Sequence, residues 1–377
     1  MEDVERVPDP TSLIAQERLL PGAPSTTFWI ALAVLVVAVF AVLVAAGLYP
    51  EGLTRSEQAA SSLPFGLADR LGREGARLAS AAAVAGACAA AALGARRLFH
   101  SDGAGILAGG ILALDPGTLA LGRLAIPDAF TLAFLAAGFA FFLALPAWSQ
   151  WAGAACVALA AVADPRAALW GVPLGLVGLL RGHIYAAPRH VGEALLQGAG
   201  IPGVAAAVVL LAGAAPATCV RSLSTLALTL VPVHDAVAIT HNPVLWFGGL
   251  AALLGLGTLV VAHVARNGRI ARLPGRVQLR LADPLPEMHA RILWLLVLGV
   301  LAPPAAWALV AALALAASVV WLAQDAPGFG LAVAVGIVGF GILGLAREWP
   351  LVTGLATPDQ VADLVSLTPW SSPVPCP

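Results

Sequence analysis

The chain has 377 residues, of which 60% are hydrophobic and 11% are charged, and its formal net charge is −1. Soluble domains contain far more charge, so this composition predicts a polytopic membrane protein without a sizeable soluble domain. A near-neutral charge excludes a nucleic-acid-binding role. We expect an all-α transmembrane bundle of about 11 spans.

The N-terminal segment 1–27 is polar and rich in acids, and the apolar run after it begins too late for a cleaved signal peptide. We therefore expect this segment to be cytoplasmic and residues 28–48 to stay as the first span. The loop 50–77 follows. Its second half, LPFGLADRLGREGARL, has the amphipathic pattern of a short helix lying at the membrane surface.

Ten further apolar runs are expected to complete one membrane domain over residues 28–346, and the tail 347–377 contains no span. The runs 151–163 and 167–180 are short, so they form either two tilted helices or one re-entrant hairpin; two helices are the preferred interpretation. The other predicted spans are 78–94, 105–114, 129–145, 194–211, 244–265, 292–301, 305–322 and 328–345.

Arginine sets the expected orientation, because positive residues collect on the cytoplasmic side. With one crossing per span, one face holds the cytoplasmic loop 266–291 together with Arg96, Arg97, Arg181 and Arg189. The loop 50–77 and the tail then face outward, although that loop also carries four arginines. All twenty basic residues are Arg, which, with abundant Ala and Gly, indicates a GC-rich bacterial genome and location in the inner (plasma) membrane.

The stretch ILALDPGTLALGRLAIPDAF joins two apolar runs through a charged connector containing Asp115, Arg123 and Asp128. Charge at a membrane boundary is costly and usually functional. In the structural interpretation, Asp115 ends a helix, Asp128 begins one, and Arg123 pairs with Asp128. In the functional interpretation, Arg123 binds a phosphate in a fork geometry while a carboxylate deprotonates an acceptor hydroxyl.

Other polar residues support less specific expectations. Asp164 and Arg166 flank a proline between two spans and form either a hinge pair or an interface pair. His234, Asp235 and His241 fit no standard metal-ligand spacing, so we expect no metal site. The cysteines contain no CxxC motif; Cys88 and Cys156 are expected in the core, whereas the predicted topology allows Cys219 and Cys376 to pair on the outer face.

The segment ARLASAAAVAGACAAAALGARRLFHSDGAGILAGGILALDPGTLALGRLAIPDAFTLAF resembles the N-terminal core of the dolichyl-phosphate-mannose protein mannosyltransferase family, within the GT-C clan of membrane glycosyltransferases. In that family, an Arg is followed five residues later by an Asp that opens a helix. Arg123 and Asp128 match this pattern. The segment CVALAAVADPRAALWGVPLGLVGLL resembles the next helix pair of the family, and HNPVLWFGGLAALLGLGTLV more weakly resembles a later loop and span.

The resemblance implies a GT-C-like bundle that transfers a sugar, mannose in this family, from a polyprenyl-phosphate donor to a protein or glycan on the outer face, with no cofactor. It implies that the catalytic candidates are Glu57, Glu51 and Asp128. It also implies a set of substrate-binding candidates, which comprises Asp115, Arg123, Arg166, Arg221 and His241. The expected partners are membrane lipids, the lipid-linked sugar and other membrane subunits.

A second interpretation is a non-catalytic accessory or structural subunit of a membrane complex, that is, a pseudoenzyme. The family usually places its catalytic acid within an Asp-Glu pair in the first outer loop, and LYPEGLTRSEQAASSLPFG has no such pair. A transporter ranks third, because the spans contain few ionisable residues and show no inverted repeat. ATP-driven transport has no support, since no phosphate-binding P-loop motif is present.

Overall fold

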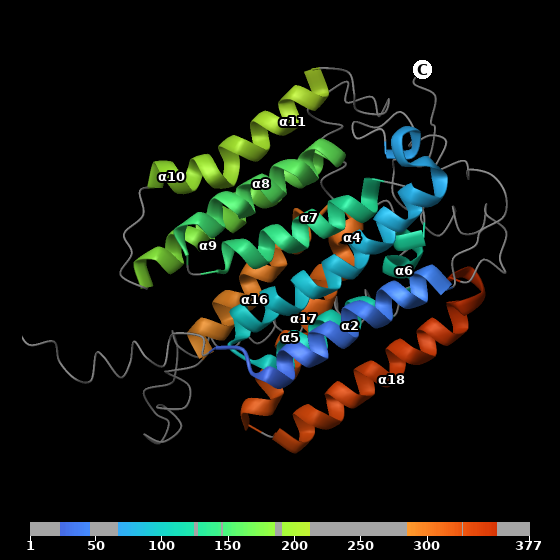
Figure 1. The fold of residues 1–377 in the computed structure, drawn as a ribbon. Helices are drawn as coiled ribbons and strands as arrows, with labels where there is room; N and C mark the ends of the chain where they lie inside the picture. Colours follow the sequence, from blue (N-terminus) through green and yellow to red (C-terminus); the bar gives the residue numbers. More distant parts are fainter. Residues whose placement is uncertain are drawn as a thin grey trace, which may run out of the picture.

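The computed structural model describes residues 23–45, 67–123, 127–144, 146–184, 191–211, 285–325 and 327–352. Within these ranges every regular element is a helix and no strand occurs, which confirms the all-α class. Most helices lie side by side and share one inclination (Figure 1). They are α2 (Thr26–Ala45), α4 (Leu67–Phe99), α5 (Asp102–Leu114), α6 (Pro116–Arg123), α7 (Pro127–Phe142), α8 (Ala147–Ala163), η1 (Pro165–Trp170), α9 (Gly171–Ile184), α10 (Val191–Leu195), η2 (Leu196–Gly200), α11 (Ile201–Leu211), α16 (Leu285–Val300), η5 (Pro304–Ala306), α17 (Trp307–Asp325) and α18 (Pro327–Val352).

Four described helices are long and apolar enough to cross a membrane, namely Thr26–Ala45, Glu74–Phe99, Val191–Leu211 and Pro327–Ala346. The bent pair of α5 and α6 is a fifth candidate span. The helices α7, α8 and α17 are apolar but shorter. The chain is therefore a helical membrane protein by length and composition, while the count of eleven spans and the cytoplasmic N-terminus remain predictions. The predicted span 244–265 lies outside the described residues.

Two local features differ from the sequence expectations. Within the charged connector, residues Pro116–Arg123 form helix α6, most of whose side chains are buried. The expected surface helix before the second span is continuous with α4 but breaks at Gly72, where φ is 68° and ψ is 171°. A residue with a side chain rarely adopts that backbone conformation, so glycine permits the change of direction. Elsewhere, α8 and α9 separate as two helices joined by η1, as preferred from sequence.

Helix α4 lies at the centre of the bundle and contacts α2, α5, α6 and α7 (Figure 1). Its inner face consists of small residues, and Ala87, Ala91 and Ala95 are fully buried. Small residues let helix backbones approach closely, which is the main source of packing energy between helices in a membrane. The alanine-rich composition of this span thus sets where its neighbours pack.

The closest of these approaches joins α5 to α4 through Gly105 and Gly109, which are spaced as in a GxxxG motif. A Cβ atom added at Gly105 would lie 2.7 Å from the Ala92 carbonyl oxygen, and one at Gly109 would lie 2.8 Å from the Cys88 carbonyl oxygen. Backbone oxygens cannot rotate away, so any side chain at either position must push α5 off α4.

We predict that Gly109→Ala destabilises the protein by about 1–3 kcal/mol through overpacking. Gly110→Ala is the matched control, because no heavy atom lies within 4 Å of an added Cβ at that neighbouring position. The control should be stabilised by about 0.5–1 kcal/mol, since alanine favours helix over glycine. Thermal unfolding of both variants in detergent measures the difference, and equal melting temperatures would contradict the close packing of α4 and α5.

The bundle has two ends, which we name by one residue each. At the Arg96 end, the Nε atom of Arg96 pairs with the Asp102 carboxylate, which also accepts a hydrogen bond from the backbone N–H of Ser25 at 3.2 Å. Arg97 donates to the carbonyl oxygen of Ala140 near the end of α7. At the Asp164 end lie the start of α7, the end of α8 and the turn η1. Two of the arginines assigned to the predicted cytoplasmic face, Arg96 and Arg97, therefore lie at the Arg96 end.

Candidate functional site

The junction of α5 and α6 is a bend of 66° at Asp115. The Asp115 side chain is 1% exposed, and its Oδ2 atom accepts hydrogen bonds at 2.7 Å from both the backbone N–H and the hydroxyl of Thr118. Pro116 supplies no N–H at the first position of α6, where a helix needs none. Asp115 thus ends α5 and caps α6, which confirms the structural interpretation of this residue.

Arg123 is the last residue of α6, is 3% exposed, and has its Nε and Nη1 atoms fully buried. The preceding residue fixes its position. A Cβ atom added at Gly122 would lie 2.7 Å from Leu43 Cδ1 and 3.2 Å from Val84 Cβ. The end of α6 is therefore held against both α2 and α4, and a permanent positive charge lies inside the bundle.

Asp128 follows Pro127 in the first turn of α7 and is 5% exposed. In the same turn, the hydroxyl of Thr131 donates to the carbonyl oxygen of Pro127 at 3.3 Å. A carboxylate at this position interacts favourably with the positive end of the helix dipole. The expectation that Asp128 begins a helix is confirmed. Asp128 is also buried, and it follows the buried Arg123 by five residues in the chain.

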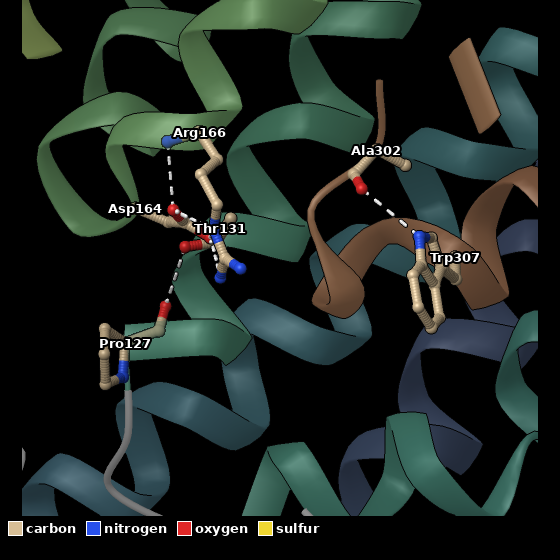
Figure 2. Close-up of polar contacts among 6 residues, drawn as sticks. All are labelled: Pro127, Thr131, Asp164, Arg166, Ala302 and Trp307. Carbon is tan, nitrogen blue, oxygen red and sulfur yellow. Dashed lines mark hydrogen bonds and ion pairs between the residues drawn. The ribbon is translucent and has the colours of Figure 1, made fainter. Parts of the chain in front are cut away.

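Asp164 and Arg166 form a local ion pair at the start of η1 (Figure 2). The Asp164 side chain is 2% exposed and accepts from the Arg166 backbone N–H at 3.0 Å, which makes it a helix cap. The Arg166 guanidinium donates through Nε to Oδ1 at 3.0 Å and through Nη2 to Oδ2 at 2.9 Å. This two-point contact orients Arg166, and it favours the hinge-pair interpretation.

The pair lies next to the first turn of α7, because α7 and α8 are consecutive helices that pack against each other (Figure 2). Helix α7 has 16 residues and α8 has 17. At 1.5 Å per residue, such helices are about 24–26 Å long, shorter than the roughly 30 Å hydrocarbon core of a bilayer. In a helix of this length that crosses a bilayer, charges at the ends would lie near the boundary of the hydrocarbon core.

Three tryptophans connect helical elements through their indole N–H groups, and the sequence analysis did not single them out. The indole N–H of the buried Trp170 donates to the Leu298 carbonyl oxygen at 2.9 Å, and that of Trp294 donates to the Pro173 carbonyl oxygen at 3.0 Å. Trp307 donates to the Ala302 carbonyl oxygen at 3.2 Å (Figure 2). A buried indole N–H needs a hydrogen-bond acceptor. The presence of a tryptophan in an apolar run is therefore the one sign of these contacts that the sequence offers.

The structure describes part of the predicted site. Asp115 and Asp164 have defined structural roles, so the functional candidates within the fold are Arg123 and Asp128, with Arg166 held nearby by Asp164. The catalytic candidates Glu51 and Glu57 lie outside the described residues, as do Arg221, His234, Asp235, His241, Cys219 and Cys376. Among the described residues, no group of three His, Cys, Asp or Glu side chains is placed to bind a metal. Cys88 is buried in the core as expected, whereas Cys156 is half-buried.

Part of the chain matches a known protein family, and the matched part contains several of the candidate site residues. Residues 67–164 match the family model of dolichyl-phosphate-mannose-protein mannosyltransferase. The match runs from the start of α4 to the cap of η1, and it contains Asp115, Arg123 and Asp128. It confirms the resemblance drawn from residues 76–134. No curated protein and no solved structure shows a significant match to the chain.

We predict that the buried Asp164 and Arg166 pair is energetically coupled. A double-mutant cycle with Asp164→Ala and Arg166→Ala should give a coupling of about 0.5–3 kcal/mol, because both partners are largely shielded from water. The control cycle uses Asp102 and Arg96, where the Asp102 side chain is 35% exposed. Water screens that pair, so its coupling should be about 0.2–1 kcal/mol. Unfolding titrations in mixed micelles measure both; a larger coupling for the control pair would contradict the assigned geometry.

Proposed function

We propose that this protein is a membrane glycosyltransferase of the mannosyltransferase type. The observation that supports this proposal most strongly is the family match over residues 67–164, together with the burial of Arg123 and Asp128 inside the matched segment. An unneeded buried charge costs stability, so two such charges at one end of an apolar bundle favour a site.

The substrate we propose is a sugar, mannose in the first instance, carried by a polyprenyl phosphate. The guanidinium of Arg123 offers a fork of N–H donors that matches two phosphate oxygens. The short helices α7 and α8 bring it close to headgroup depth, where a lipid-linked phosphate is found. The lipid tail then needs no pocket within the protein, because it stays in the surrounding membrane.

The proposed reaction is an inverting displacement. A carboxylate removes the proton of an acceptor hydroxyl on a protein or glycan, and the hydroxyl oxygen attacks the anomeric carbon. The bond from that carbon to the phosphate oxygen breaks, and the polyprenyl phosphate leaves with the electron pair. Arg123 stabilises the negative charge that develops on the leaving phosphate.

Glu57 is the proposed base, with Glu51 and Asp128 as alternatives. The described residues flanking the loop 50–66 support this assignment: α2 begins at the Arg96 end and reaches Gly122 through Leu43, and α4 begins at the other end. Both attachment points of the loop thus belong to the same end of the bundle as Arg123. We further propose that this end faces the outside of a bacterial inner membrane, and that Arg166, Arg221 and His241 contact the substrate.

A second candidate function is that of a non-catalytic subunit. It is favoured because nearby charged side chains stabilise the fold. Asp115 caps α6, and the carboxylate of Asp164 orients Arg166. In that case Arg123 and Asp128 only stabilise the fold, and the protein is retained for its contacts with other membrane subunits.

Sugar transfer from synthetic polyprenyl-phosphate-mannose to acceptor peptides or glycans separates the two candidates. Glu57→Gln should lower kcat by about 10²–10⁴-fold, because the base is lost. Arg123→Lys should lower kcat/KM by about 10²-fold, because a lysine keeps the charge but loses the fork.

Arg97→Lys is the matched control, since it makes the same exchange at the opposite end of the bundle, where the Arg97 guanidinium donates to the Ala140 carbonyl oxygen of α7. It should retain wild-type turnover. Turnover that survives both Glu57→Gln and Arg123→Lys, or a folded wild-type protein without turnover, would contradict the proposed enzyme.

A further inference from the structure

A series of contacts along α4 shows which residues share a level in the bundle. Gly105 of α5 packs on Ala92, Gly109 packs on Cys88, and Gly122 of α6 packs on Val84. Each contact lies one helical turn further along α4 toward its start. The next turn on the same face of α4 is Ser80, four residues before Val84. Arg123, which follows Gly122, is therefore the residue of α6 nearest to the level of Ser80.

Helix α7 reaches the same level from another side. Near the Arg96 end, a Cβ atom added at Gly94 would meet the Phe139 ring, so these residues face each other. The chain passes from α6 into α7 at the opposite end, so α7 runs parallel to α4. Asp128 precedes Phe139 by eleven residues, and the same step along α4 leads to position 83. Ser80, Arg123 and Asp128 thus lie at similar depth around one part of the bundle.

Ser80 is the unusual member of this group. Its side chain is 0% exposed, and its Oγ atom has no hydrogen-bond partner among the residues that the structure describes. Serine within a helix commonly donates to the carbonyl oxygen four residues earlier, as Ser318 does to Ala314 at 3.0 Å. A buried hydroxyl without a partner is costly and calls for an explanation.

We infer that Ser80 is a phosphate-binding residue, whose hydroxyl donates a hydrogen bond to an oxygen of the lipid-linked phosphate held by Arg123. This inference rests on the proposed function and names a further contact for its donor. A hydroxyl donating to a charged oxygen forms a short, strong hydrogen bond. Ser80 keeps its proton throughout the proposed reaction, so its role is to bind and orient the phosphate.

The test measures binding of a synthetic polyprenyl monophosphate to the full chain in nanodiscs, with wild type, Ser80→Ala and Ser80→Cys. Both variants should weaken binding about tenfold, because a hydrogen bond to a charged group is lost. Without ligand, the melting temperature of Ser80→Ala should equal or exceed that of wild type, since an unsatisfied hydroxyl has been removed. Ser318→Ala is the matched control and should leave the affinity unchanged.

Each outcome bears on the inference separately from the proposed function. Wild-type binding that Ser80→Ala leaves unchanged would overturn the inference while the glycosyltransferase stands. A lower melting temperature of Ser80→Ala with unchanged affinity would show that the hydroxyl serves only the fold. Binding of inorganic phosphate that depends on Ser80, without binding of the lipid phosphate, would support the anion site and contradict the lipid donor. Absence of any binding to wild type would overturn both.

Discussion

The arrangement of the site depends on the Asp115 carboxylate, which accepts two hydrogen bonds from Thr118 within an apolar bundle. Without this cap, the first turn of α6 would leave backbone N–H groups unsatisfied in the interior, where each costs several kcal/mol relative to water. With it, α5 stops after 13 residues and the chain turns by 66°. The turn carries α6 across α4 and delivers Arg123 to a buried position next to the start of α7.

Small residues allow the bend to be buried. Gly105, Gly109 and Gly122 bring two successive helices into backbone contact with α4, and side chains at these positions would meet backbone or core atoms. The alanine-rich face of α4 then accommodates α5, α6 and α7 around one helix. Arg123 and Asp128 are both buried, and close packing around a buried charge would restrict its movement, which is what the proposed site requires.

Much of the fold was predictable from hydrophobic patterning. The apolar runs at 28–48, 105–114, 129–145 and 328–345 correspond to α2, α5, α7 and α18, with differences of a few residues at most ends. Asp115 and Asp128 were predictable as helix-terminal acids, because each adjoins a proline beside an apolar run. Helix α6 was missed because PGTLALGR is too short and too rich in glycine for a periodic signal, and its stability comes from tertiary contacts with α2 and α4.

The candidate site was predictable only in part. The spacing of Arg123 and Asp128 predicted the pair, and both residues lie within the matched residues 67–164, while their role stays a proposal. Ser80 carried no signal in the sequence, since a serine in an alanine-rich helix is ordinary until its burial and its hydrogen bonds are known. The indole contacts of Trp170 and Trp294 span more than 120 positions, so local sequence pattern carries no information about them.

The central claim is that the end of the bundle holding Arg123 binds a lipid-linked phosphate. Photocrosslinking tests it most directly, with a polyprenyl phosphate that carries a diazirine beside the phosphate group, followed by peptide mapping. We predict crosslinks in α6, in α4 around Ser80 and in the first turn of α7, and their loss in competition with unlabelled polyprenyl phosphate. Crosslinks that instead map to the Arg96 end, around residues 96–102 and 140–144, would contradict the account.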